Sequence, residues 1–159
     1  FSIMSEKGGP YHDSLVYNYS ACVNHHCMFE RNKSTYNLLV STGYLRYFTK
    51  EAGGAITDYD IDFTRLTDLL VQERLLLSSK IYPFQQQVFN TENFHYINLN
   101  ERPISKLTLR NWNAESWWLY RNYLTELRVI NESIIENCQH VLAKANGTLN
   151  ILRTEYKTE

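Results

Sequence analysis

The sequence predicts an all-α protein, folded as an antiparallel up-and-down helical bundle with two long helices and two shorter ones. Apolar residues return every three, four or seven positions over two long stretches, as they do on one face of a helix. Alternation of apolar and polar residues, which is typical of a strand, never runs cleanly for five residues or more. The apolar stripes are broad, which favours globular packing over a two-stranded coiled coil.

Composition sets the broad class of protein. With 159 residues, of which 43% are apolar, the chain is long enough to bury one core. We expect a flexible lead-in over residues 1–12 and a single helical domain over residues 13–159. The net charge is −1 and Lys and Arg do not cluster, so nucleic-acid binding is excluded as a function. No run of about 18 apolar residues is present that could span a membrane.

The N-terminal third predicts two modest helices. Asp13 or Ser14 can cap a first helix that ends near Arg31. Asn32 or Ser34 can cap a second, short helix over 35–41. Gly43 should end it, because glycine adopts the left-handed conformation at little cost. Residues 44–48 should add a turn or two of helix.

The first long helix should follow a break at Glu51-Ala52-Gly53-Gly54. Thr57, with Asp60 three residues later, resembles a capping box and predicts its start. Aspartates at 58, 60 and 62 would then complement the helix dipole. Pro83 should kink this helix, because the apolar stripe resumes beyond it. The stripe consists of Tyr59, Phe63, Leu66, Leu70, Leu77, Ile81, Phe84 and Val88.

The last helix is the longest. Residues 90–112 are polar and predict a loop, and Asn113 then caps a helix that runs to Tyr156. Gly147 should bend or fray it. Its stripe consists of Trp117, Tyr120, Leu124, Leu127, Ile134, Cys138, Val141, Ala145, Leu149, Leu152 and Tyr156.

One stretch resembles a known family. It is Asn32-Lys33-Ser34-Thr35-Tyr36, then Leu39, then Ser41-Thr42-Gly43-Tyr44-Leu45. With the long helix that follows, it resembles the extracytoplasmic domain of an uncharacterised family of small membrane-anchored helical proteins of Bacteroidota. The resemblance implies a helical architecture, an extracytoplasmic or periplasmic location and a membrane anchor, but no reaction. The family's membrane helix is not in this sequence, so we expect it to have preceded Phe1.

The segment with the most potential metal ligands is Cys22-Val23-Asn24-His25-His26-Cys27. Thiolates and imidazoles are preferred zinc ligands, and on a helix Cys22 lies one turn from both His25 and His26. Cys27 would point about 140° away and would not join them. A zinc site at Cys22, His25 and His26 therefore competes with two other interpretations. In one of these Cys22 is a small core residue with the histidines at the edge of the stripe, and in the other the cysteines have a redox or disulfide role.

A cluster of aromatic residues opens the last helix and is the candidate partner face. Adjacent Trp117 and Trp118 point about 100° apart, so one should lie at the edge of the core. Exposed aromatics mark protein-binding faces, although packing beneath the preceding loop would also explain them. The cluster consists of Trp112, Trp117, Trp118, Tyr120 and Tyr123.

Catalytic signatures are weak. No nucleophile elbow or phosphate loop is present. The Glu92-x-x-His95 spacing of di-iron bundles occurs once, whereas such a site needs it twice. We therefore expect a non-enzymatic interaction, sensory or scaffold domain that binds a protein partner or itself, with a metal-binding helical bundle as the alternative.

Overall fold

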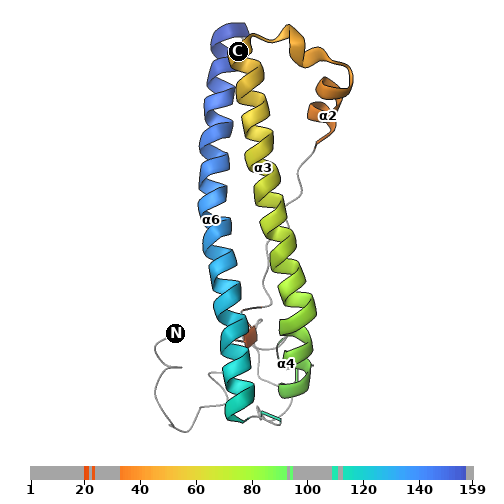
Figure 1. Ribbon diagram of the computed structural model, residues 1–159, viewed down its shortest axis with the longest axis vertical. Coiled ribbons are helices and arrows are strands. Elements are labelled where there is room, and N and C mark those ends of the chain that lie inside the picture. Colours follow the sequence, from red (N-terminus) through yellow and green to blue (C-terminus); the bar gives the residue numbers. More distant parts are fainter. Residues whose placement is uncertain are drawn as a thin grey trace. The chain divides into compact units, whose positions relative to one another are not determined.

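A computed structural model describes residues 33–92 and 113–156, together with residues 20, 21, 23, 94, 109 and 110 (Figure 1). These residues form helices and no strand, so the all-α prediction is confirmed for them. The predicted lead-in and most of the predicted first helix lie outside the described residues, although Ser20 and Ala21 are helical and buried. The elements are α2 (Ser34–Ser41), the 3₁₀ turn η2 (Tyr44–Tyr47), α3 (Lys50–Leu76), the π-turn η3 (Leu77–Ile81), α4 (Tyr82–Val88) and α6 (Ala114–Tyr156).

The chain divides into two compact units. Unit 1 takes in the described residues of Phe1–Cys27 and Leu76–Leu124, and unit 2 those of Met28–Leu75 and Thr125–Glu159. The helix α6 is continuous and contributes to both units. A single domain over residues 13–159 stays a prediction.

The short helix α2 ends where the sequence predicts. Gly43 has φ of 70°, in the left-handed region, and the amide of Thr42 donates to the carbonyl oxygen of Leu38 at 3.0 Å. The start differs, because Lys33 is the N-cap and makes no side-chain cap. None of the residues of α2 is buried within unit 2.

The helix α3 begins seven residues before Thr57, so the predicted break at residues 51–54 and the cap at Thr57 are wrong. Thr49 is the cap: its Oγ1 accepts a hydrogen bond from the amide of Ala52 at 3.1 Å. Its carbonyl oxygen accepts the first helical bond, from Gly53, at 2.9 Å. Each glycine weakens a helix by about 1 kcal/mol, but the cap and complete burial of Ala52 favour helix here.

The earlier start also overturns the dipole explanation for the three aspartates. They lie well inside α3, where the end of the dipole is too far away to matter.

Pro83 interrupts the α-helical pattern at the predicted place. The chain passes through η3, in which the amide of Tyr82 bonds to the carbonyl of Leu77, and continues as α4 with proline in its first turn. Proline has no amide to donate, and a π-turn is one way for a helix to absorb that loss. Phe84 and Val88 beyond it are buried, as the resumed stripe predicts.

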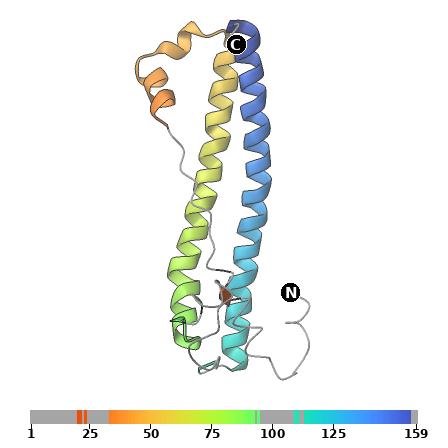
Figure 2. The same ribbon diagram turned by 180° about the vertical axis from the view of Figure 1, so that it is seen from behind.

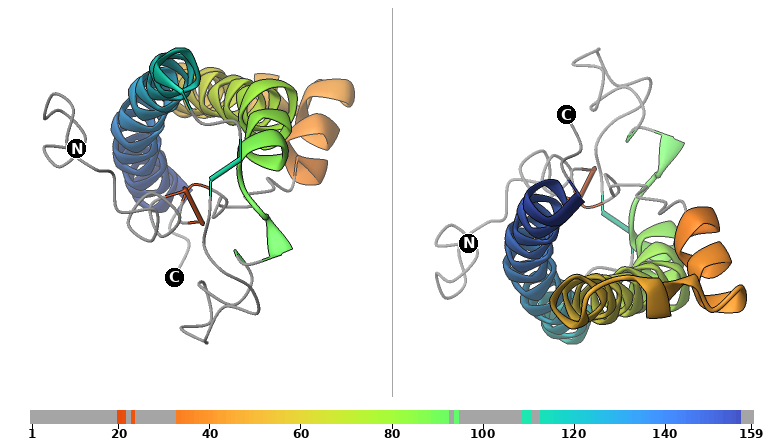
Figure 3. Two further views of the ribbon diagram at one scale, coloured as in Figure 1. Left: turned by 90° about the horizontal axis from the view of Figure 1, so that it is seen from below. Right: turned by 90° about the horizontal axis from the view of Figure 1, so that it is seen from above.

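The core of unit 2 lies between α3 and α6. Phe63, Leu66 and Leu70 of α3 form a buried cluster with Val141 of α6, and Tyr59 and Ile134 pack against it. Figure 2 shows the two helices side by side in this unit, as Figure 1 does from the other side. Figure 3, which looks along the helices, shows α2 on the side of α3 that is turned away from α6.

The helix α6 begins and ends as predicted, but only some residues of its predicted apolar stripe are buried. Within it Tyr120, Leu124, Leu127 and Val141 are buried, whereas Cys138 and Leu149 are exposed. Gly147 neither ends nor frays the helix, which continues to Tyr156. The observed inner positions beyond Leu127 therefore follow a seven-residue step through Ile134, Val141 and Thr148.

Candidate functional site

The candidate partner face in unit 1 is built on the first turns of α6. Asn113 caps this helix as predicted, because its Oδ1 accepts a hydrogen bond from the amide of Ser116 at 2.8 Å. The amide of Trp117 donates to the carbonyl of Asn113 at 3.0 Å. These bonds fix the directions in which Trp117 and Trp118 leave the helix.

Tyr120 is not part of an exposed face, which corrects its assignment as a partner-binding residue. Its side chain is 0% exposed. Its ring stacks on Phe84 of α4 with centroids 5.0 Å apart, and Phe89 lies 5.8 Å away. The aromatic cluster predicted from the sequence is therefore partly core, since the position two residues beyond Trp118 points inward.

A closed hydrogen-bond network holds the Tyr120 hydroxyl. It donates to Oγ of Ser20 at 2.9 Å and accepts from Nε2 of Gln85 at 3.1 Å. The same Nε2 donates to the carbonyl oxygen of Ser20 at 3.1 Å. Burial raises the pKa of Tyr120 above 10.0, and its hydrogen bonds with Ser20 and Gln85 offset part of that rise. A neutral, buried network of this kind fixes packing and offers no group for acid–base chemistry near neutral pH.

The remaining aromatics lie at or near the surface of unit 1. Trp118 is 66% exposed, and its neighbour Leu119 is also exposed. Trp117 is half-buried. Tyr123 is half-buried too, with Phe84 against its edge at 6.2 Å and Nζ of Lys80 5.8 Å from its centroid. Trp112 lies outside the described residues.

In unit 2, a polar row links α3 to α6 that the sequence did not predict. Oδ2 of Asp62 lies 3.0 Å from Nε2 of His140, and Oδ1 of Asp62 lies 3.2 Å from the guanidinium of Arg65. One turn along, Oδ2 of Asp58 lies 3.9 Å from Nζ of Lys144. The sequence signal for it is the spacing of the aspartates, which a helix start at Thr57 would also explain, but α3 starts at Lys50.

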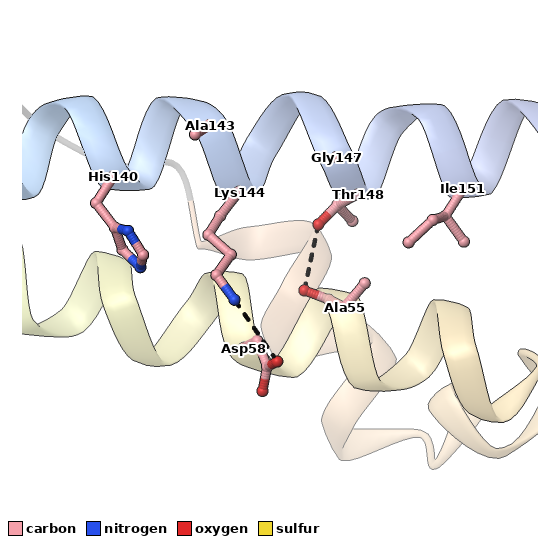
Figure 4. A pocket seen from close by; sticks show the side chains of 8 residues that line it. All are labelled: Ala55, Asp58, His140, Ala143, Lys144, Gly147, Thr148 and Ile151. Atoms are coloured by element: carbon pink, nitrogen blue, oxygen red, sulfur yellow. Dashed lines mark hydrogen bonds and ion pairs between the residues drawn. The ribbon is translucent and has the colours of Figure 1, made fainter.

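An open groove of about 320 Å³ lies beside this row. Figure 4 shows the residues that line it, and the hydrogen bond from the Thr148 hydroxyl to the carbonyl of Ala55, at 3.2 Å. The groove is mostly apolar and is lined by Ala55, Asp58, His140, Ala143, Lys144, Gly147, Thr148 and Ile151. Its charged groups already face one another, so it has the character of a packing gap between two helices.

The predicted zinc ligands Cys22, His25 and His26 lie outside the described residues, and so does His95. Among the residues that the structure describes, no three His, Cys, Asp or Glu side chains gather as a metal site would need. The zinc site therefore stays a prediction.

The chain matches no known protein family, and neither a curated protein nor a solved structure is significantly similar to it. Across the described part of the chain, no helix combines the length and the apolar character needed to cross a membrane.

Proposed function

We propose that this chain is a non-enzymatic helical interaction module that binds a protein partner through the exposed aromatic residues at the start of α6. The observation that carries the proposal is that Trp118 is 66% exposed, whereas Tyr120, two residues further along the same helix, is completely buried. A large, rigid aromatic side chain held in place loses little conformational freedom on binding, which is why Trp is over-represented among binding hot spots.

The local geometry supports this role. Tyr120 anchors the helix from inside through Phe84, Phe89 and the network to Gln85. Trp118 and Leu119 therefore project from a fixed surface, and the half-buried Trp117 borders them. A partner with an apolar cavity or groove would bury Trp118 and gain roughly 2 to 3 kcal/mol from that side chain.

We also propose an antiparallel up-and-down bundle as the architecture. In unit 2, Asp58, Asp62 and Ala55 of α3 meet Lys144, His140 and Thr148 of α6. Residue numbers fall along one helix as they rise along the other, which is the pattern of antiparallel neighbours. Thr49 continues it, because its amide donates to the hydroxyl of Tyr156 at 3.0 Å.

The location that we propose is extracytoplasmic and membrane-anchored, and its support is the resemblance of residues 32–45. A module held at a membrane would meet its partner at high local concentration, so a modest aromatic face would suffice for binding.

The test is site-specific photo-crosslinking in cells that make the protein. A photoreactive phenylalanine derivative replaces Trp118, and a matched chain carries it at Gln87, which is exposed in α4 of the same unit. We expect a discrete crosslinked species at position 118 that is absent at position 87. Equal crosslinking at both positions, or none at 118, would overturn the partner face.

Binding of the identified partner is then measured with Trp118→Ala and with Gln87→Ala as its control. We expect at least about a tenfold loss for the tryptophan variant alone, with the far-UV circular dichroism spectrum unchanged. Retained affinity in Trp118→Ala would contradict the proposal.

A further inference from the structure

The C-terminal half of α6, within unit 2, carries a second apolar strip beside the one that packs against α3. Ile135, Leu142 and Leu149 follow each other at seven-residue intervals and are 58%, 63% and 48% exposed. Successive helix residues lie about 100° apart, so Leu142 cannot share the inward direction of Val141. The open seam, as we name this strip, consists of Ile135, Cys138, Leu142, Ala145, Leu149 and Leu152.

The spacing of the open seam is that of a coiled coil. Its steps are three, four, three, four and three residues, which keeps one line of side chains facing one partner helix. It spans about 26 Å along the helix. Ile135, Leu142 and Leu149 are exposed, and so is Cys138. Ala145 and Leu152 are half-buried. The open seam is thus an apolar surface that the described residues of unit 2 leave largely exposed, and apolar surfaces of this kind mark interaction sites.

We propose that a second copy of this chain covers the open seam, with the two α6 helices packed antiparallel about a two-fold axis between Leu142 and Ala145. In an antiparallel pair, residues whose numbers have a constant sum lie opposite each other. With the axis at this point, Leu142 faces Ala145 of the other copy, Leu149 faces Cys138, and Ile135 faces Leu152. All six seam residues therefore find a partner within the seam, as a closed two-fold interface requires.

Side-chain volume favours this arrangement over a parallel one. In the antiparallel pairing, the central layers each combine a leucine with the smaller Ala145 or Cys138, so the layers have similar width. In a parallel pair in register, Leu142 would meet Leu142 and Ala145 would meet Ala145. Wide and narrow layers would then alternate, and the narrow ones would leave voids, which are destabilising.

Charge at the edge of the open seam also fits the antiparallel pair. The positions beside the seam on its outer edge are Glu132, Gln139, Asn146 and Arg153. About the proposed axis, Glu132 of each copy lies next to Arg153 of the other, and the neutral Gln139 and Asn146 meet near the middle. A parallel pair would bring like charges to the same end. Complementary edge charges of this kind select helix orientation.

The self-association site is separate from the aromatic face that we propose for a protein partner. The open seam lies in unit 2 and Trp118 lies in unit 1. The two proposals can therefore fail independently, and Trp118→Ala is a control for the dimer.

The first experiment is sedimentation velocity of the full chain from about 5 to 500 µM. Because the open seam is short, we expect weak association: a dimer of twice 18.8 kDa with a dissociation constant of about 10 to 100 µM. Leu142→Glu should raise that constant at least about thirtyfold, because it buries a charge in an apolar layer. Val129→Glu makes the same change at an exposed apolar residue of α6 outside the seam, and should leave the dimer intact. A monomeric wild-type chain at 500 µM, or equal loss in both variants, would overturn the proposal.

The second experiment tests the orientation. Glu132→Arg and Arg153→Glu should each weaken the dimer about threefold to tenfold, and the double variant should restore it. Glu132 also pairs with Arg128 one turn away, so helicity is monitored by circular dichroism. Under mild oxidation, Leu149→Cys should crosslink to Cys138 of the other copy, which it faces, whereas two copies of Cys138, about 16 Å apart along the helices, should not crosslink to each other. A disulfide between two copies of Cys138, identified by peptide mass spectrometry, would show a parallel pair and contradict the proposed axis.

Discussion

Removing one hydroxyl group tests the packing that holds the start of α6 in place. In Tyr120→Phe the ring is kept, together with its stacking on Phe84, and only the hydrogen bonds of the hydroxyl are lost. The variant therefore separates the polar network from the aromatic core. It also keeps the volume of the site almost constant, so a cavity contributes little.

The magnitude follows from the bonds that the hydroxyl makes. It donates to Ser20 and accepts from Gln85, and all three groups are buried. One buried hydrogen bond contributes about 1 kcal/mol net, and a buried polar group left without a partner costs about 1 to 3 kcal/mol. Nε2 of Gln85 would keep its bond to the Ser20 carbonyl, so only part of its hydrogen-bonding capacity is lost. We expect Tyr120→Phe to lower the free energy of unfolding by about 2 to 3 kcal/mol.

The assay is urea unfolding followed by far-UV circular dichroism and by tryptophan fluorescence, with the free energy extrapolated to water. Tyr44→Phe is the matched control, because Tyr44 is exposed and the same atom is removed. We expect less than about 0.5 kcal/mol for that variant. A loss below about 0.5 kcal/mol in Tyr120→Phe would refute the network, since a hydroxyl in contact with water would behave in that way.

Three further predictions use other assays. Burial raises the pKa of Tyr120 above 10.0, so the stability that its neutral form contributes is present below pH 10 and is lost as the pH rises through the raised pKa. Above pH 10, the free energy of unfolding should therefore fall more steeply with pH in the wild type than in Tyr120→Phe, and equal slopes would contradict this prediction. Thr49→Ala removes the side-chain cap of α3 and should cost about 1 kcal/mol in urea unfolding, whereas Thr49→Ser, which keeps the cap, should cost less than half of that. If the Cys22 segment binds zinc, elemental analysis of the reduced chain should find about one equivalent that His26→Ala releases, and a metal-free wild type would dismiss that hypothesis.

Helix ends were predictable where a single residue decides them. Gly43 ends α2 by its left-handed backbone, and Asn113 starts α6 by capping it. The start of α3 was not predictable in this way, because Gly53 and Gly54 favour a break in the helix and Thr57 has the sequence pattern of a cap. The actual cap at Thr49 is reinforced from a distance, since the Thr49 hydroxyl donates to Glu155 and the backbone of Thr49 to Tyr156. A sequence window contains no information about partners that lie more than a hundred residues away.

The candidate site, like the helix ends, was predictable only in part. The pattern located the aromatic cluster but assigned Tyr120 to the partner face, because polarity alone does not show that Gln85 and Ser20 would enclose its hydroxyl. The pairing of Asp62 with His140 was missed for the same reason, since each residue looks like ordinary surface on its own helix. Long-range pairs appear only after the register between two helices is known.

The divided stripe of α6 shows why a periodic pattern does not reveal which neighbour it serves. Leucine, valine and alanine recur on this helix over an arc wider than one contact needs, and the sequence presents that arc as a single stripe. The structure assigns Val141 to the contact with α3 and leaves Leu142 and Leu149 exposed. A helix that met only one neighbour would gain nothing from seven-residue repetition on its uncovered side, and exposed leucines there promote aggregation. A second helix packed against them would explain their regular spacing, and the edge charges at Glu132 and Arg153 fit a second α6 running the opposite way.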